Sequence, residues 1–148
     1  MKFATEYLWF NTAGDKAYKL LQEAYQAAEA DENEKALEVL DRLTRQFPKF
    51  AEGWNRRAAV YWQMGQWAKS RADCERALAL NPYHYGAWQG LGLARLQEGD
   101  VAEACRCLSA ALRILPHDPA TREALQRCEE LRRSRPAPEP SAKAPVLT

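Results

Sequence analysis

Three prolines lie 34 residues apart in this chain, at Pro48, Pro82 and Pro116. Proline makes up only about 5% of an average sequence, so two repetitions of one interval indicate an internal repeat. Other positions keep the same interval, with apolar or small side chains in each set. These sets are Leu20, Trp54 and Trp88; Ala24, Ala58 and Gly92; Ala36, Ser70 and Ala104; and Leu43, Ala77 and Ala111.

Within each unit, large and small residues follow the period of an α-helix. In the middle unit, Trp54, Ala58 and Tyr61 share one helix face because they are spaced i, i+4 and i+7. The turn between the two helices of a unit is marked by Asp31, Gly65 and Gly99. A pair of helices of this kind cannot bury its apolar face alone, so we expect the units to stack and bury it together.

The repeated residues resemble the tetratricopeptide repeat, whose pattern is W-x2-L-G-x2-Y, then A-x3-F, then P. The third unit supplies Trp88, Leu91, Gly92, Ala104, Leu108 and Pro116, with Arg95 in place of the tyrosine. The second supplies Trp54, Ala58, Tyr61 and Pro82 and departs at Arg57, Ser70 and Cys74. The first supplies Leu20, Ala24, Ala36, Leu40 and Pro48. The strings PKFAEGWNRRAAVYWQMG and NPYHYGAWQGLGLARLQEGD also resemble small stand-alone tetratricopeptide proteins of bacteria and plastids.

The resemblance implies an all-α, right-handed α-solenoid of three helix-turn-helix units. We expect these units at 17–50, 51–84 and 85–118, followed by a capping helix at 119–135. An aromatic segment at 1–16 is expected to form a short helix near 3–11, separate from a repeat helix that begins at 16. The Pro-rich stretch 136–148 cannot fill a core and is expected to be a disordered tail. Helix caps are expected at Asp15, Asp100 and Asp118.

In the family that the chain resembles, the first helix of each unit lines a concave groove that accepts peptides. Carried over by position, the groove residues here are Tyr18, Leu21, Tyr25, Asn55, Ala59, Trp62, Gln89, Leu93 and Leu96. Apolar walls would bury side chains of a guest, while the amides of Asn55 and Gln89 would bond its backbone. The sequence therefore predicts a non-enzymatic adaptor, scaffold or assembly factor that binds a peptide segment of another protein. The alternative is that some of these residues pack against the amino-terminal segment.

Some members of this family hold the terminal carboxylate of chaperone tails with lysine, asparagine and arginine side chains. The corresponding positions here are Leu21, Tyr25, Arg56, Gly86 and Gly90. Because the basic pair of the third unit is missing, we do not expect this chain to bind heat-shock chaperone tails.

Aromatic residues are concentrated at the amino terminus, where Phe3, Tyr7 and Phe10 would share one helix face. One interpretation is a hydrophobic cap on the first hairpin. Another is a patch for self-association, which would make the chain a homo-oligomer, and a third is an arm that folds into the groove.

Other classes of function find little support in the sequence. The formal net charge is +1 without a basic stripe, so we do not expect nucleic-acid binding. No apolar run approaches the roughly 20 residues that span a bilayer, so we expect no membrane insertion. His84 and His117 lie a whole unit apart, which leaves no expected catalytic, cofactor or metal site.

The cysteines are Cys74, Cys105, Cys107 and Cys128. They show no CxxC spacing, and Cys105 and Cys107 point to different helix faces, which disfavours a shared zinc ion. A reducing cytoplasm is the expected compartment, or an organelle stroma if a transit peptide has been removed.

Overall fold

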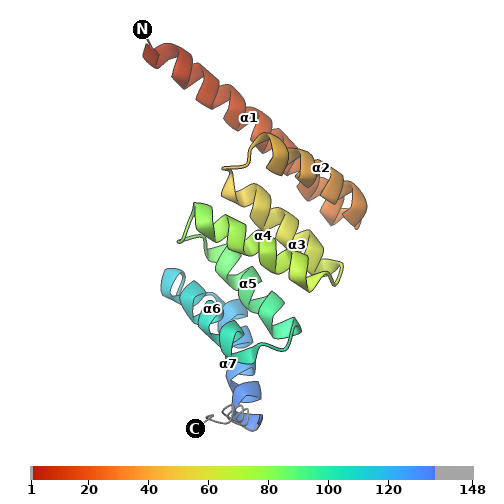
Figure 1. The fold of residues 1–148 in the computed structure, drawn as a ribbon, viewed down its shortest axis with the longest axis vertical. Helices are drawn as coiled ribbons and strands as arrows, with labels where there is room; N and C mark the ends of the chain where they lie inside the picture. Colours follow the sequence, from red (N-terminus) through yellow and green to blue (C-terminus); the bar gives the residue numbers. More distant parts are fainter. Residues whose placement is uncertain (1, 136–148) are drawn as a thin grey trace, which may run out of the picture.

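Seven α-helices form the part of the chain that the computed structural model describes, which is the backbone of residues 2–135 and the side chains of residues 14–135. They are α1 (Lys2–Glu29), α2 (Asn33–Gln46), α3 (Ala51–Gln63), α4 (Trp67–Leu80), α5 (Tyr85–Gln97), α6 (Val101–Ile114) and α7 (Pro119–Ser134). Consecutive helices form antiparallel pairs that stack from α1 to α7 along the long axis (Figure 1). The prediction of an all-α stack of helical hairpins is confirmed. The expected disordered tail lies outside the described residues.

The turn inside each unit depends on one residue with a left-handed backbone. Asp31, Gly65 and Gly99 have φ angles of 62°, 75° and 86°, and they lie at equivalent repeat positions. Glycine adopts this conformation without a Cβ clash, and Asp is among the few other residues that tolerate it. The residue after Gly65 donates its backbone N–H to the Tyr61 carbonyl, which closes the helix end.

The recurring proline and tryptophan are joined by a hydrogen bond at the link between units. The indole Nε1 of Trp54 donates to the Pro48 carbonyl at 2.9 Å, and Trp88 donates to Pro82 at 2.8 Å. The first helix of a unit is therefore fixed to the turn that precedes it. This contact gives a physical reason for the shared 34-residue spacing of the two residue types.

An arginine network holds the first two units together. Arg57 on α3 makes a bidentate pair with Asp73 on α4, with distances of 2.7 and 2.9 Å. It also donates to Asp41 on α2 at 3.0 Å. Arg57, which departs from the apolar repeat pattern, thus links three helices by charge-assisted hydrogen bonds.

The first helices of the units form the inner side of the stack. Helix α1 contacts α3, α3 contacts α5, and α5 contacts α7, whereas α2, α4 and α6 make no contact with one another within the described residues. The distance between neighbouring units is therefore shorter on the side of α1, α3, α5 and α7. This difference places the inner surface of the stack on those helices.

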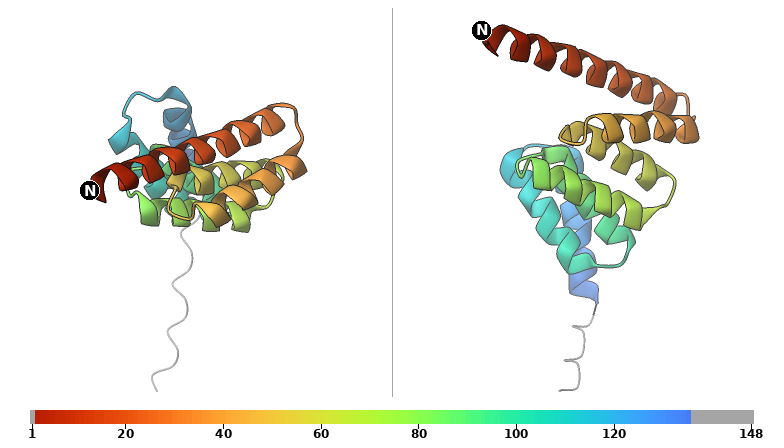
Figure 2. Two further views of the ribbon diagram at one scale, coloured as in Figure 1. Left: turned by 90° about the horizontal axis from the view of Figure 1, so that it is seen from above. Right: turned by 45° about the horizontal axis from the view of Figure 1, so that its top comes forward.

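Helix α1 is a single continuous helix, and this differs from the sequence-based expectation. A short helix near 3–11 and a separate helix capped by Asp15 were expected, but Asp15 and Gly14 both lie inside Lys2–Glu29. Glycine inside a helix costs only about 1 kcal/mol relative to alanine, which is too little to end it. The first half of α1 extends beyond α2 into solvent (Figures 1 and 2).

Two of the expected helix caps are observed. The Asp100 carboxylate accepts from the Glu103 backbone at 3.3 Å, and Asp118 accepts from the Thr121 backbone at 2.9 Å. Pro119 occupies the first position of α7, where a backbone N–H would have no acceptor within the helix. Among the helices described, none has the combination of length and apolar character that crossing a bilayer requires.

Candidate functional site

A cavity of about 270 Å³ lies on the inner side of the stack between α3 and α5. Its lining comes from α3, α4 and α5. It consists of Asn55, Arg56, Ala58, Ala59, Trp62, Gln63, Ser70, Cys74, Gly86, Gln89, Gly90 and Leu93. The structure thus brings together five of the nine residues expected in a groove, namely Asn55, Ala59, Trp62, Gln89 and Leu93. We call this cavity the α3–α5 groove.

Two glycines keep the α3–α5 groove open. A Cβ atom at Gly86 would lie 3.2 Å from the amide nitrogen of Asn55, and one at Gly90 would lie 3.0 Å from the Cys74 sulfur. Any larger side chain at these positions would occupy the cavity or press on its walls.

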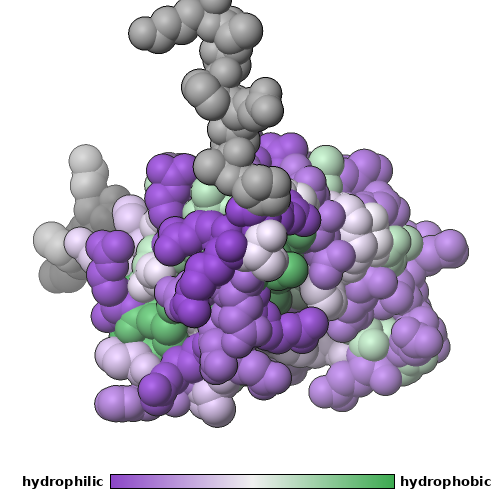
Figure 3. Space-filling model, turned by 90° about the horizontal axis from the view of Figure 1, so that it is seen from below, coloured by the Kyte–Doolittle hydropathy of each residue, from purple (hydrophilic) through white to green (hydrophobic). Residues whose placement is uncertain are grey.

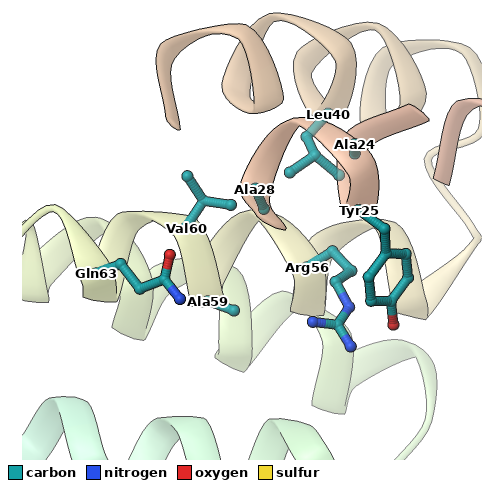
Figure 4. Close-up of a pocket in the computed structure, with 8 residues that line it drawn as sticks. All are labelled: Ala24, Tyr25, Ala28, Leu40, Arg56, Ala59, Val60 and Gln63. Carbon is teal, nitrogen blue, oxygen red and sulfur yellow. The ribbon is translucent and has the colours of Figure 1, made fainter. Parts of the chain in front are cut away.

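A second and much smaller cavity, of about 40 Å³, lies where α1 and α2 meet α3 (Figure 4). Arg56 and Ala59 line both cavities. The guanidinium carbon of Arg56 lies 3.8 Å from the ring centroid of Tyr25, which holds the arginine by a cation–π contact. Arg56 Nε is 3.4 Å from a Glu52 carboxylate oxygen. A cation is therefore held in place on the wall that the two cavities share.

A histidine–glutamate pair joins α3 to the start of α5. The Nδ1 atom of His84 accepts from the Ala87 backbone at 3.0 Å and caps α5. The proton therefore lies on Nε2, which donates to the Glu52 carboxylate at 2.7 Å. Burial alone would raise the pKa of Glu52, but the hydrogen bond from His84 and the charge of Arg56 outweigh it and hold that pKa below its usual value.

Gln89 is oriented by the last helix. Its amide nitrogen donates to the hydroxyl of Thr121 at 2.9 Å. The same hydroxyl lies 2.5 Å from the Tyr85 hydroxyl, which also donates to Asp118. Helix α7 thus fixes one amide of the groove, which the sequence did not indicate.

Trp62 offers a hydrogen-bond donor that is unused among the described residues. Its indole nitrogen is buried, yet it has no hydrogen-bond partner. The ring packs at a tilt against Trp67, with 5.7 Å between centroids. An unpaired buried N–H is unfavourable, so an acceptor that reached it would stabilise the protein.

The remaining expected groove residues lie elsewhere. Leu21 is only 6% exposed and belongs to the core between α1, α2 and α3, because burying a leucine side chain stabilises by about 1.5–3 kcal/mol. Leu96 packs against the core of α6 and α7. Tyr18 is 61% exposed, with its ring centroid 6.2 Å from that of Phe50. Tyr25 lines the small cavity only.

Metal binding and thiol reactivity depend on the His, Cys, Asp and Glu residues in the described part of the chain. No three His, Cys, Asp or Glu residues there lie close enough to hold a metal ion. Burial raises the pKa of the Cys74 thiol to about 12 and that of Cys107 to about 11, which leaves both protonated and poorly nucleophilic.

Comparison with known families agrees with the repeat. Models of the tetratricopeptide repeat match residues 51–84 and 86–128. The chain belongs to the tetratricopeptide repeat family. Proteins built from tetratricopeptide repeats typically mediate interactions with other proteins and are generally non-catalytic.

Relatives of known sequence are longer than this chain. It is 33% identical over 117 residues to a TPR repeat-containing protein of Rhizobium etli, covering 78% of this chain and 57% of that protein. It is 28% identical over 104 residues to tetratricopeptide repeat protein 33 of Mus musculus, covering 70% of this chain and 40% of that protein.

Among solved structures, the first TPR of Spaghetti (RPAP3) bound to an HSP90 peptide has a similar fold. The TM-score is 0.79 at 21% identity, and the match covers 81% of this chain and 95% of that domain. The TM-score shows a shared fold, and at this identity the comparison shows the fold alone.

Proposed function

We propose that this chain is a non-enzymatic interaction module that holds a peptide segment of another protein in the α3–α5 groove. The observation that supports the proposal is the cavity between α3 and α5, which combines apolar and polar side chains in its wall. In this proposal the module comprises the units 17–50, 51–84 and 85–118, closed by the capping helix at 119–135. It would act as an adaptor, scaffold or assembly factor.

The lining of the groove suits a peptide backbone more than a free anion. The Trp62 ring forms part of the wall, and the amides of Asn55 and Gln89 provide hydrogen-bonding groups for the backbone of a guest. Ala59 and Leu93 leave room for an apolar side chain. Arg56 adds one positive charge, which favours a guest with an acidic residue near this point.

Chaperone tails remain an unfavourable guest in this proposal, although the related RPAP3 domain binds an HSP90 peptide. Gly86 and Gly90 stand where such binders place cations, and Leu21 is buried in the core. Arg56 alone, already paired with Glu52 and Tyr25, provides less attraction for a carboxylate than a set of free cations.

A selection of random peptides displayed on phage tests the proposal, with the full chain immobilised. Peptides recovered on the wild type should bind at least tenfold more weakly to the Asn55→Ala plus Trp62→Ala variant, because tryptophan is enriched among hot spots, whose truncation costs about 2 kcal/mol or more. The Ala59→Glu variant adds bulk inside the groove without removing packing and should show the same loss. A matched control removes one aromatic and one amide outside the groove, through Tyr83→Ala plus Gln97→Ala, and should bind normally. Equal binding by all four folded proteins would refute the proposal.

Self-association through the amino terminus is the second candidate, and one observation favours it. The first half of α1, whose sequence includes Phe3, Tyr7 and Phe10, extends beyond α2 in Figure 2. Elsewhere the large apolar side chains that are well exposed are few, and the face in Figure 3 is mostly hydrophilic with small separate hydrophobic areas. These exposed side chains are Tyr18, Leu80, Tyr83, Leu115 and Leu131.

Light scattering distinguishes the two candidates. If the aromatic segment joins two chains, the full chain has the mass of a dimer or larger oligomer, and removal of residues 1–12 gives a folded monomer. If both forms are folded monomers, self-association is excluded. Peptide binding that survives the truncation would support the groove independently of this result.

A further inference from the structure

Two buried cysteine side chains face each other between α6 and α7. The sulfur atoms of Cys105 and Cys128 lie 2.9 Å apart, although the residues are 23 positions apart in the sequence. Cys105 is 4% exposed and Cys128 is 0% exposed. Cys107 belongs instead to a separate core cluster with Cys74, so the four cysteines divide into two locations.

We propose that Cys105 and Cys128 are a redox-sensitive pair that forms a reversible disulfide and ties the last helix to the stack. A disulfide bond is about 2.05 Å long, so less than one ångström of approach separates the two sulfur atoms from bonding distance. The helices that carry them already pack against each other. Both thiols are free in the structure.

Oxidation requires α7 to open, because both thiols are hidden from reagents in the closed stack. Burial, and then the contact with Cys105, raises the pKa of the Cys128 thiol above its usual value, so the closed state contains almost no reactive thiolate. Helix α7 is the last described helix and packs only on α5 and α6. A helix with few packed neighbours opens locally more easily than one that is packed on both sides.

The reaction is an exchange with a small-molecule disulfide such as oxidised glutathione. The thiolate of one cysteine attacks a sulfur atom of the reagent, forms a mixed disulfide and releases half of the reagent as a thiolate. The thiolate of the second cysteine then attacks the protein-bound sulfur and displaces the other half. The two protein thiols lose two protons and two electrons in total, and the reagent is reduced to two thiols.

The bond would stabilise both the fold and the groove. It closes a loop of about two dozen residues, which raises the melting temperature of a chain of this size by roughly 5–10 °C. Helix α7 also provides Thr121, which orients Gln89, so the oxidised chain would hold one groove amide more firmly. The inference is independent of the proposed function because it concerns the thiols alone.

Tryptic mapping of the oxidised full chain tests the pair directly, since each cysteine lies on its own tryptic peptide. Cys105 is in 96–106, Cys107 in 107–113, Cys128 in 128–132 and Cys74 in 72–76. The folded chain is incubated with oxidised glutathione, its remaining thiols are alkylated, and the peptides are identified by mass spectrometry. A portion treated with a phosphine reductant provides the reference melting temperature.

We expect one linked species, which joins 96–106 to 128–132 with the loss of two hydrogen atoms, and the higher melting temperature given above. The Cys107→Ser and Cys74→Ser variants should keep both signals, whereas Cys105→Ser and Cys128→Ser should lose both. Three results would overturn the proposal. They are free thiols at both positions under conditions that fully oxidise the urea-unfolded chain, links to Cys74 or Cys107 in similar amounts, and glutathione adducts without a protein disulfide.

Discussion

Gly92 lies at a close contact between α5 and α6, and its replacement by alanine measures how tightly the repeat is packed. The added Cβ atom would lie 2.8 Å from Leu108 Cγ and 2.9 Å from Leu108 Cδ2. Leu108 is fully buried, so it cannot move away into solvent. Overpacking of this kind costs about 1–3 kcal/mol, of which the better helix propensity of alanine recovers about 1 kcal/mol. We therefore expect Gly92→Ala to lower the free energy of unfolding by about 1 kcal/mol.

Gly14 provides a matched control for this substitution. It lies inside α1, and a Cβ atom there would meet nothing within 4 Å. Gly14→Ala should therefore stabilise the chain by about 0.5–1 kcal/mol through helix propensity alone. Urea unfolding followed by far-ultraviolet circular dichroism should place the two variants on opposite sides of the wild type.

A double-mutant cycle with Leu108→Ala identifies the contact responsible. Truncation of Leu108 destabilises the core but empties the space that the new methyl group needs. In that background Gly92→Ala should become stabilising, with a coupling energy of about 2 kcal/mol. A Gly92→Ala protein as stable as the wild type, or an equal cost in both backgrounds, would refute the close packing at this repeat position.

Three further predictions concern charged groups. Arg57→Met should lower the free energy of unfolding by about 3 kcal/mol in urea titrations, because the carboxylate of Asp73, only 8% exposed, would lose its bidentate partner. The pKa of Glu52 is held below its ordinary value of 4.5, so its pairing with His84 stabilises the fold above that pH and is lost as the pH falls below it. As the pH is lowered below about 4.5, the melting temperature should therefore decrease less steeply for Glu52→Gln than for the wild type. Asp118→Ala removes the cap of α7 and should speed hydrogen exchange in that helix while the rate in α3 stays unchanged.

The sequence was sufficient to predict most of the fold because residues at equivalent repeat positions make equivalent packing contacts. Prolines, tryptophans and turn residues at one interval indicated the units, and the left-handed φ angles of Asp31, Gly65 and Gly99 match that prediction. The predicted start of the first helix was wrong because Gly14 was expected to interrupt the helix. Whether a glycine ends a helix depends on what surrounds it, and here nothing crowds α1 at that point.

The groove residues could be predicted only on helices whose equivalent repeat positions face the cavity in the same way. Asn55 and Gln89 occupy the same position on α3 and α5, and both line the cavity. Leu21 occupies that position on α1 but points into the core, since an apolar side chain gains by burial. The arginine network and the contact between Cys105 and Cys128 could not be predicted, because both join residues from different repeat positions through the relative placement of the helices.

Nuclear magnetic resonance mapping of a bound peptide would test most directly whether the inner side of the stack is the binding surface. The isotope-labelled full chain would be titrated with a peptide recovered from the phage selection, and the backbone amide shifts recorded. The account predicts the largest shifts on α3 and α5, together with the indole N–H of Trp62, which has no hydrogen-bond partner among the described residues. Shifts concentrated on α2, α4 and α6, with an unchanged Trp62 indole, would contradict it.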